Sequence, residues 1–189
     1  MTFSTFELLI KNQITMRKLF TTFALVFGLS VLSQAQTSID EMVKDWERAK
    51  AYSKEYLDAM PKDKYSFRAQ DSIRTFAQQM LHLSQGIVGF IANGTGAQRI
   101  SFGQNLEQRA TAQSADSVPY FVTTSYDYAI ESIRNMDISK LTETAGRGNF
   151  MFSRLVWLNK AFEHQTHHRG QTTVYIRLAG ATPPQEKLF

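Results

Sequence analysis

The segment HQTHHRGQTTVYIRLAGATPP, residues His164–Pro184, contains three of the four histidines of this 189-residue chain. His164 and His168 are four residues apart, a spacing that places both side chains on one face of an α-helix, one turn apart. Gly180 and Pro183-Pro184 follow in the order that ends a helix. The segment therefore predicts the closing part of a long helix, which we place at Phe150 to Leu178.

Three further amphipathic helices are predicted upstream, with apolar residues recurring mainly at three- and four-residue steps. Ser38 and Glu41 fit a capping box at the start of the first one. Residues 97–116 are polar and hard to place, and Ala145–Asn149 is predicted to be a loop. The expected helices are Ile39 to Met60, ended by Pro61; Asp71 or Ser72 to Ala92, ended by Asn93–Gly96; and Asp116 or Ser117 to Met136, with Pro119 in its first turn.

The predicted fold class is all-α. No strand pattern is strong, and four long amphipathic helices favour a four-helix bundle, which we assign to residues 36–189. The chain contains no cysteine, so the bundle must be stabilised by packing, without disulfides or thiolate metal ligands. Bundles of this kind build metal and cofactor sites from side chains on facing helices, which makes the histidines candidates for such a site.

The N-terminus has the pattern of a cleavable secretory signal. Arg17 and Lys18 precede a mostly apolar run of 14 residues, from Leu19 to Leu32, which is shorter than the roughly 20 residues that span a bilayer. Ser33-Gln34-Ala35 supplies small residues where signal peptidase cleaves. We expect residues 1–35 to be a signal peptide, with translation starting at Met1 or Met16. The mature chain is then exported, to the periplasm of a bacterium, and has no membrane anchor.

The charge of the mature chain argues against nucleic acid as a partner. Removal of residues 1–35 takes away three basic residues and one acidic residue, and lowers the net charge from +4 to +2. No cluster of Lys and Arg remains, and no basic-aromatic pattern suggests nucleic-acid binding. A small-molecule substrate and a homodimer are both compatible with the sequence.

The histidine pair has two interpretations. Trp157, Ala161 and Tyr175 lie on the same helix stripe, so the pair is expected to point into the bundle. A buried polar group without a partner costs about 1–3 kcal/mol, so an inward pair needs a metal ion or a hydrogen-bond network. The alternative to a metal is a pair that is hydrogen-bonded to buried polar neighbours or solvated at the end of the bundle. Metalloproteases use this spacing in H-E-x-x-H, but residue 165 here is Gln, so the base glutamate is absent. His167 lies roughly 80° around the helical wheel and is expected outside the site.

His82 has less support from its own helix. On a helical wheel it lies roughly 130° from the centre of the apolar arc, at the rim, where a histidine is usually solvated. Gly86 and Gly89 share its face, which would let another helix or a ligand approach closely. Spacing alone does not assign His82 to a site.

Two segments resemble the DinB-like (damage-inducible) family. His164–Pro184 looks like that family's closing helix, with the pattern H-x3-H-R-G-Q followed by an arginine and G-x-x-P-P. MPKDKYSFRAQDSIRTFAQQMLHLSQG, residues Met60–Gly86, is similar to its second-helix region, including the single histidine. The resemblance covers most of the mature chain. It implies a four-helix bundle in which His82, His164 and His168 hold a divalent metal ion, and zinc or nickel suits such ligands.

Three imidazole ligands leave coordination positions for water or a substrate, so three functions are considered. The first is metal-dependent hydrolysis of an ester or amide. The second, which the resemblance implies for some relatives, is thiol-dependent transfer with a small thiol such as bacillithiol or mycothiol. Export counts against it, because those thiols are cytoplasmic reductants. The third is a non-catalytic metal-binding or stress-related module.

Several other residues are considered without an assigned role. Asp127, Glu131 and Tyr126 on the third expected helix can face the metal, but such residues are more often ordinary helix positions, and no catalytic residue is assigned. Gln171 is a weak candidate for orienting a ligand. Gly170 lies inside the last helix, where glycine costs about 1 kcal/mol relative to alanine. It is either a tolerated defect or a point of tight backbone packing.

Overall fold

The computed structural model describes residues 16–20, 23, 38–103 and 105–189, and these residues are mostly helical. Most of the predicted signal peptide, residues 1–35, lies outside the described residues. The chain divides into two compact units, residues 1–40 and 41–189. Within the described parts of the chain, no helix is both long and apolar enough to cross a membrane.

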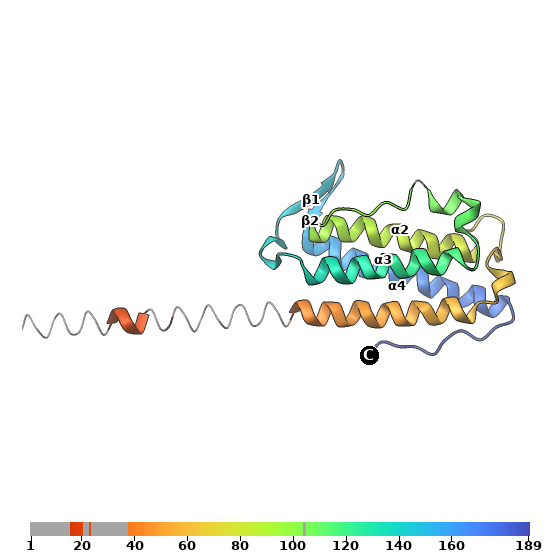
Figure 1. Ribbon diagram of the computed structural model, residues 1–189, viewed down its shortest axis with the longest axis horizontal. Helices are drawn as coiled ribbons and strands as arrows, with labels where there is room; N and C mark the ends of the chain where they lie inside the picture. Colours follow the sequence, from red (N-terminus) through yellow and green to blue (C-terminus); the bar gives the residue numbers. More distant parts are fainter. Residues whose placement is uncertain (1–15, 21–22, 24–37, 104) are drawn as a thin grey trace, which may run out of the picture. The chain divides into compact units, whose positions relative to one another are not determined.

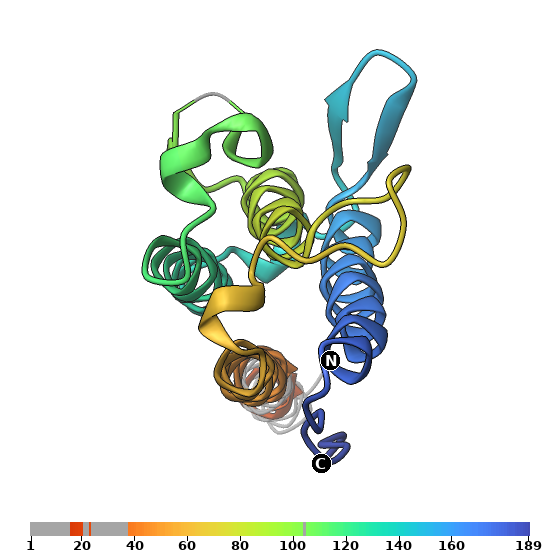
Figure 2. The same cartoon turned by 90° about the vertical axis from the view of Figure 1, so that its right-hand side faces the viewer.

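Four long helical segments follow residue 38 in the part of the chain that the structure describes. They are residues 38–59, α2 (Phe76–Thr95), α3 (Ser117–Arg134) and α4 (Arg154–Leu178). From residue 41 onward these helices lie side by side, and the end-on view shows them packed as a bundle (Figures 1 and 2). α2 packs against both α3 and α4. The helical part of the predicted fold class is therefore confirmed.

The core is filled by the apolar stripes that the sequence predicts. The Trp46 ring packs against Tyr126 of α3 and Phe162 of α4, with ring centroids 5.8 and 5.5 Å apart. Burial of such large side chains supplies most of the free energy that holds a chain without disulfides. Fully buried residues include Phe76, Met80, Leu83, Ile87 and Ile91 of α2, Val118, Ala129 and Ile133 of α3, and Ala161 and Ile176 of α4.

A buried polar cluster fixes the rotation of α4. Arg169 Nη1 and the Tyr126 hydroxyl both donate to Gln165 Oε1, at 2.7 and 2.8 Å, and the Ser53 and Tyr126 hydroxyls lie 2.6 Å apart. Gln165 and Arg169 thus face residues 41–59 and α3. Because consecutive helix residues differ by about 100°, His164 and His168 present a different face of α4.

The second helix begins later than predicted. Thr75 is its N-cap: the Thr75 hydroxyl accepts from Gln78 N, and Thr75 N donates to Gln78 Oε1. This box satisfies two of the backbone N–H groups at the helix start, which Asp71 and Ser72, the expected caps, do not do. The helix also ends later than the predicted Ala92, because it continues to Thr95 and only Gly96, in the left-handed conformation with φ +80°, ends it.

The fourth helix is also shorter than predicted. Residues expected to begin it form a strand, β2 (Phe150–Ser153), which pairs antiparallel with β1 (Thr144–Arg147). A short apolar run such as FMFS fits a helix or a strand equally well, so periodicity alone cannot distinguish them. Gly146, with φ +119°, allows the hairpin: a Cβ there would lie 1.9 Å from the Phe150 carbonyl oxygen. Ser153 then caps α4 by accepting from Val156 N.

The remaining helix limits agree closely with the sequence. The first helical segment ends at residue 59, just before Met60 and Pro61, although Ser38 is already helical and not a cap. Asp116 precedes α3, but its side chain makes no capping bond; Ser117 N donates to Ser114 Oγ. Residues 97–116 contain two short 3-10 turns, η2 (Leu106–Gln108) and η3 (Ala110–Ala112), within otherwise irregular chain.

Candidate metal centre

The three histidines expected as ligands come together between α2 and α4. His82 lies on α2, and its ring centroid is 5.2 Å from that of His164 and 4.5 Å from that of His168. The His164 and His168 centroids are 4.3 Å apart. Each ring offers one nitrogen such that all three nitrogens lie within 4.8 Å of one another. Zinc binds imidazole nitrogens at about 2.0–2.1 Å, so three nitrogens at this spacing could hold one ion between them.

Two ring nitrogens of this cluster are buried without a hydrogen-bond partner among the described residues, His164 Nε2 and His168 Nδ1. Burial lowers the pKa of His164 to about 4 and that of His168 to about 3, and repulsion from neighbouring histidines contributes. Both rings are therefore neutral at pH 7, the form that binds a metal. Leaving such a nitrogen unpaired costs about 1–3 kcal/mol, so coordination would remove a penalty that the fold otherwise carries.

Close approach of α4 to α2 at this point depends on Gly86, one turn after His82. A Cβ placed on residue 86 would lie 2.0 Å from Nε2 of His164. Only glycine leaves room for the imidazole at this position. The expectation that the Gly86 face permits a close approach is confirmed, and the group that approaches is a histidine of the cluster itself.

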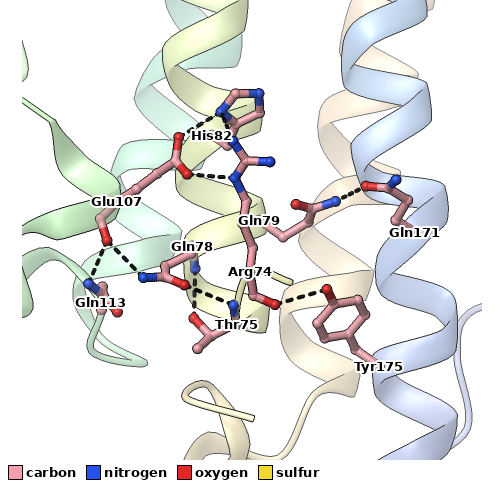
Figure 3. A network of polar contacts seen from close by, with 9 residues as sticks. All are labelled: Arg74, Thr75, Gln78, Gln79, His82, Glu107, Gln113, Gln171 and Tyr175. Carbon is pink, nitrogen blue, oxygen red and sulfur yellow. Dashed lines mark hydrogen bonds and ion pairs between the residues drawn. The ribbon is translucent and has the colours of Figure 1, made fainter. Parts of the chain in front are cut away.

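A carboxylate orients His82. Glu107 Oε1 lies 2.6 Å from His82 Nδ1, and Arg74 Nε donates to Glu107 Oε2 at 2.5 Å (Figure 3). Arg74 Nη2 is also 3.1 Å from His82 Nδ1. Since Nδ1 carries either a proton or a lone pair, the shorter contact favours Nδ1–H donating to Glu107. Nε2 of His82 then presents its lone pair to the cluster, the arrangement typical of a metal-binding histidine.

Glu107 is ionised and firmly held. Burial would raise its pKa, but hydrogen bonds from Arg74 and His82 outweigh burial and lower it. The Glu107 carbonyl oxygen accepts from the amides of Gln78 and Gln113, at 3.1 and 2.7 Å (Figure 3). The neighbouring Leu106 is fully buried. The turn η2 is therefore anchored on both its polar and its apolar side, and it delivers Glu107 to His82.

Sequence reasoning missed Glu107. It stands alone in the unpatterned segment 97–116, and no periodicity indicates which helix such a segment crosses. Gln171, the weak candidate for an orienting group, contacts Gln79 and His167 instead of His164 or His168. His167 itself is exposed, as expected for a residue outside the cluster.

The three unassigned residues of α3 lie elsewhere. Asp127 pairs with Lys50, at 2.5 Å; Glu131 contacts Arg134; and Tyr126 belongs to the buried polar cluster. None of the three takes part in the histidine cluster, which agrees with leaving them unassigned. Apart from its own helix, no atom of the described chain lies within 4 Å of a Cβ built on Gly170, so tight packing there is wrong and a tolerated glycine is correct.

Together, the fold and the cluster define a class of protein: a helical bundle with three histidines on two facing helices that could bind one metal ion. A model described as the DinB family matches residues 33–188. The chain therefore belongs to the DinB family. A search of curated protein sequences gives no significant match.

Solved structures with the same fold support this assignment. A DinB-like protein from Bacillus cereus aligns with a TM-score of 0.67 at 20% identity, covering 78% of this chain and 97% of that chain. A DinB-like protein from Bacillus subtilis gives 0.63 at 16% identity, with 77% and 96% covered. A conserved protein from Enterococcus faecalis gives 0.57 at 14% identity, with 74% and 95% covered. At these identities the likeness is one of fold.

Proposed function

We propose that this protein binds one divalent metal ion, zinc or nickel, through His82, His164 and His168. The observation that carries the proposal is a pair of buried nitrogens, on His164 and His168, that have no hydrogen-bond partner in the described part of the chain. They lie next to a His82 ring that already contacts Glu107. Three neutral nitrogen donors without a thiolate suit borderline metals such as zinc and nickel better than magnesium or calcium.

We further propose that the metal-bound protein is a hydrolase acting on an ester or amide of a small molecule. A divalent ion with open positions supplies Lewis-acid chemistry, which lowers the pKa of water or of a thiol and polarises a carbonyl. The chain's own residues keep three imidazoles neutral and fixed: the Glu107–Arg74 pair holds His82, and Gly86 leaves space for His164. The chain has no cysteine nucleophile of its own.

Elemental analysis tests metal binding directly. The purified protein is compared with a His164→Ala, His168→Ala double variant and with His167→Ala, a matched control whose histidine is exposed on the same helix. Stoichiometric zinc or nickel is expected in the wild type and in the control, and loss of the metal in the double variant. Equal metal content in all three proteins would refute the site. Circular dichroism confirms that each variant is folded.

Activity is tested on the metal-loaded protein with panels of esters and amides, in the presence and absence of a small thiol. Turnover without thiol, lost in the double variant, is the expected result. Consumption of an electrophile only when thiol is present would instead indicate a thiol-dependent transferase. Metal binding without turnover in either panel would indicate a non-catalytic metal-binding module.

Export is proposed from the N-terminal pattern and is tested independently of the metal. Cell fractionation is expected to place the protein in the periplasm, and N-terminal sequencing to find a mature chain that begins near Gln36. A cytoplasmic product that retains residues 16–35 would overturn this proposal, and it would remove the argument against a thiol co-substrate.

A further inference from the structure

A cavity of about 810 Å³ lies beside the histidine cluster, walled by α2, α4 and the β-hairpin. Four aromatic side chains line it, from all three of these elements: Phe90, Phe150, Phe152 and Trp157. His164 also lines the cavity, and it is the residue that the cavity shares with the cluster. A molecule seated in this cavity would therefore lie against one of the three candidate ligands.

The aromatic walls are held in place by specific contacts. Trp157 Nε1 donates to the Ala145 carbonyl oxygen at 2.9 Å, which ties the hairpin to α4. The Trp157 ring centroid is 5.5 Å from that of Phe90 and 5.8 Å from that of Phe152. Phe90 in turn packs edge to face on His164, at 5.0 Å. A continuous row of rings thus extends from the hairpin to the histidine cluster.

Several apolar side chains that line this cavity are left exposed. Phe150 is 67% exposed and Phe152 is 44% exposed, and Val156 on the first turn of α4 is 36% exposed. Apolar surface gathered around a concavity is the usual composition of a small-molecule site, in which the ligand's own apolar body covers it.

The charged side chains that line the cavity sum to a net positive charge. Arg147 on β1 lines the cavity, and among the described residues no carboxylate lies within 4.0 Å of its guanidinium group. Lys160 is neutralised by Glu163, at 2.5 Å. The free cation of Arg147 therefore complements an anionic group, because guanidinium forms paired hydrogen bonds with carboxylate.

We propose that this cavity is the substrate subsite of the histidine cluster, and that it takes a small organic anion with an aromatic or branched apolar body. The apolar body contacts the Phe90, Phe152 and Trp157 rings, and the anionic group pairs with Arg147. The role of this cavity in catalysis rests on the proposed metal function. Binding of the organic anion depends only on the aromatic walls and on Arg147.

Binding of 4-phenylbutyrate tests the proposal, by calorimetry on the protein as purified and again after chelator treatment. The neutral 4-phenylbutanol and the cationic 4-phenylbutylamine have similar shapes and isolate the effect of charge. The carboxylate is expected to bind most tightly and the amine least. Arg147→Gln is expected to weaken carboxylate binding by up to about fivefold, the upper end of the range for an exposed ion pair. Arg177→Gln, an exposed arginine at the far end of α4, is the matched control and should change nothing.

A second variant tests the aromatic wall. Phe152→Ser removes an exposed ring that the core does not need, and it should weaken binding of all three compounds alike. The measurement after chelator treatment is needed because a carboxylate can also bind a metal ion. If the protein still prefers the carboxylate over the alcohol and the amine after metal removal, the preference is due to Arg147.

The outcomes separate the two proposals. Stoichiometric metal with no binding of the carboxylate, or binding that Arg147→Gln leaves unchanged, overturns the subsite and leaves the metal site standing. Arg147-dependent binding in a protein that takes up no metal overturns the metal proposal and keeps the subsite. A dimer in sedimentation that Phe150→Ser dissociates would show that a second copy covers these rings, and it would overturn the subsite.

Discussion

Gly86→Ala should separate metal binding from folding stability. The added Cβ would lie 2.0 Å from Nε2, 2.4 Å from Cδ2 and 2.9 Å from Cε1 of His164. These separations are far inside van der Waals contact, so the two groups cannot both keep their positions. The colliding atoms belong to a side chain, which can rotate, and not to the backbone of α4. We therefore expect the His164 ring to move and the helices to stay where they are.

Two opposing terms partly offset each other in the folding stability of Gly86→Ala. Overpacking in a well-packed interior typically costs about 1–3 kcal/mol, while replacing glycine with alanine inside a helix gains about 1 kcal/mol. The net loss of stability should therefore be at most about 2 kcal/mol. Metal affinity has no such compensation, because one of three ligands is displaced. Removal of a group that merely orients a ligand already costs about 10- to 100-fold in affinity, so Gly86→Ala should cost at least as much.

Competition with a chromogenic zinc chelator measures the affinity, and thermal denaturation of the metal-free protein measures the stability. Gly89→Ala is the matched control: it lies on the same helix, and its nearest new contact is the end of the Arg99 side chain, at 3.1 Å. We expect Gly89→Ala to bind zinc as the wild type does. If Gly86→Ala also keeps wild-type affinity, His164 is not a ligand in the proposed geometry, and the reasoning fails.

Three further predictions follow from the same contacts. Glu107→Gln should weaken zinc binding about 10- to 100-fold, because it releases His82. The control variant Glu131→Gln alters a surface ion pair on α3 and should leave zinc affinity unchanged. Competition with the chromogenic chelator measures the zinc affinity of both variants. Gly170→Ala should raise the free energy of unfolding by about 0.5–1 kcal/mol in urea titration, because its position is helical, exposed and open; a loss of stability there would contradict the open space around it. The metal-free protein should lose stability as the pH falls from about 6.5 towards 4. In the folded protein His164 and His168 have pKa values of about 4 and 3, whereas in the unfolded chain both have a pKa of 6.5. The unfolded chain therefore binds more protons in this pH range, which favours unfolding. A double variant with leucine at both positions should show a flatter profile of melting temperature against pH, and equal slopes would contradict the burial of the two rings.

The histidine pair on α4 could be predicted because both residues sit on one helix. A four-residue spacing fixes their relative position, and Trp157, Ala161 and Tyr175 indicate which face is buried. His82 could not be predicted in this way. Its place at the edge of the apolar arc is correct, but that edge is where α4 approaches, and only the family resemblance indicated it. A helical wheel describes one helix and contains no information about its neighbour.

Two features that sequence reasoning missed, the strand β2 and the role of Glu107, share one physical cause, whereas the late start of α2 does not, because its Thr75–Gln78 capping box is local. Phe150 to Ser153 is a strand because Gly146 leaves room for the Phe150 carbonyl oxygen of the opposite strand and because the Trp157 indole holds β1 through the Ala145 carbonyl. Glu107 reaches His82 because Gln78 and Gln113 hold its turn across α2. In each case the deciding contact joins residues that are distant in the sequence or lie on different elements. Local pattern cannot supply such contacts, whereas it located the first helix and α3 to within a few residues.

Two pairs of residues on α4, His164 with His168 and Gln165 with Arg169, face different neighbouring helices. Gln165 and Arg169 face the first helix and α3, where, among the described residues, every partner of the Arg169 guanidinium is a neutral oxygen or the face of Tyr52. His164 and His168 precede them by one residue each and face α2, where two of their nitrogens have no hydrogen-bond partner among the residues that the structure describes. A buried arginine whose Nη1 lies within hydrogen-bond distance of three oxygens allows α4 little rotation, because any turn of the helix would take that charge away from these acceptors. The two histidines therefore cannot relieve their unpaired nitrogens by turning the helix away from α2. The polar cluster on one face thus keeps the imidazoles on the other face together at the spacing that one cation can bridge.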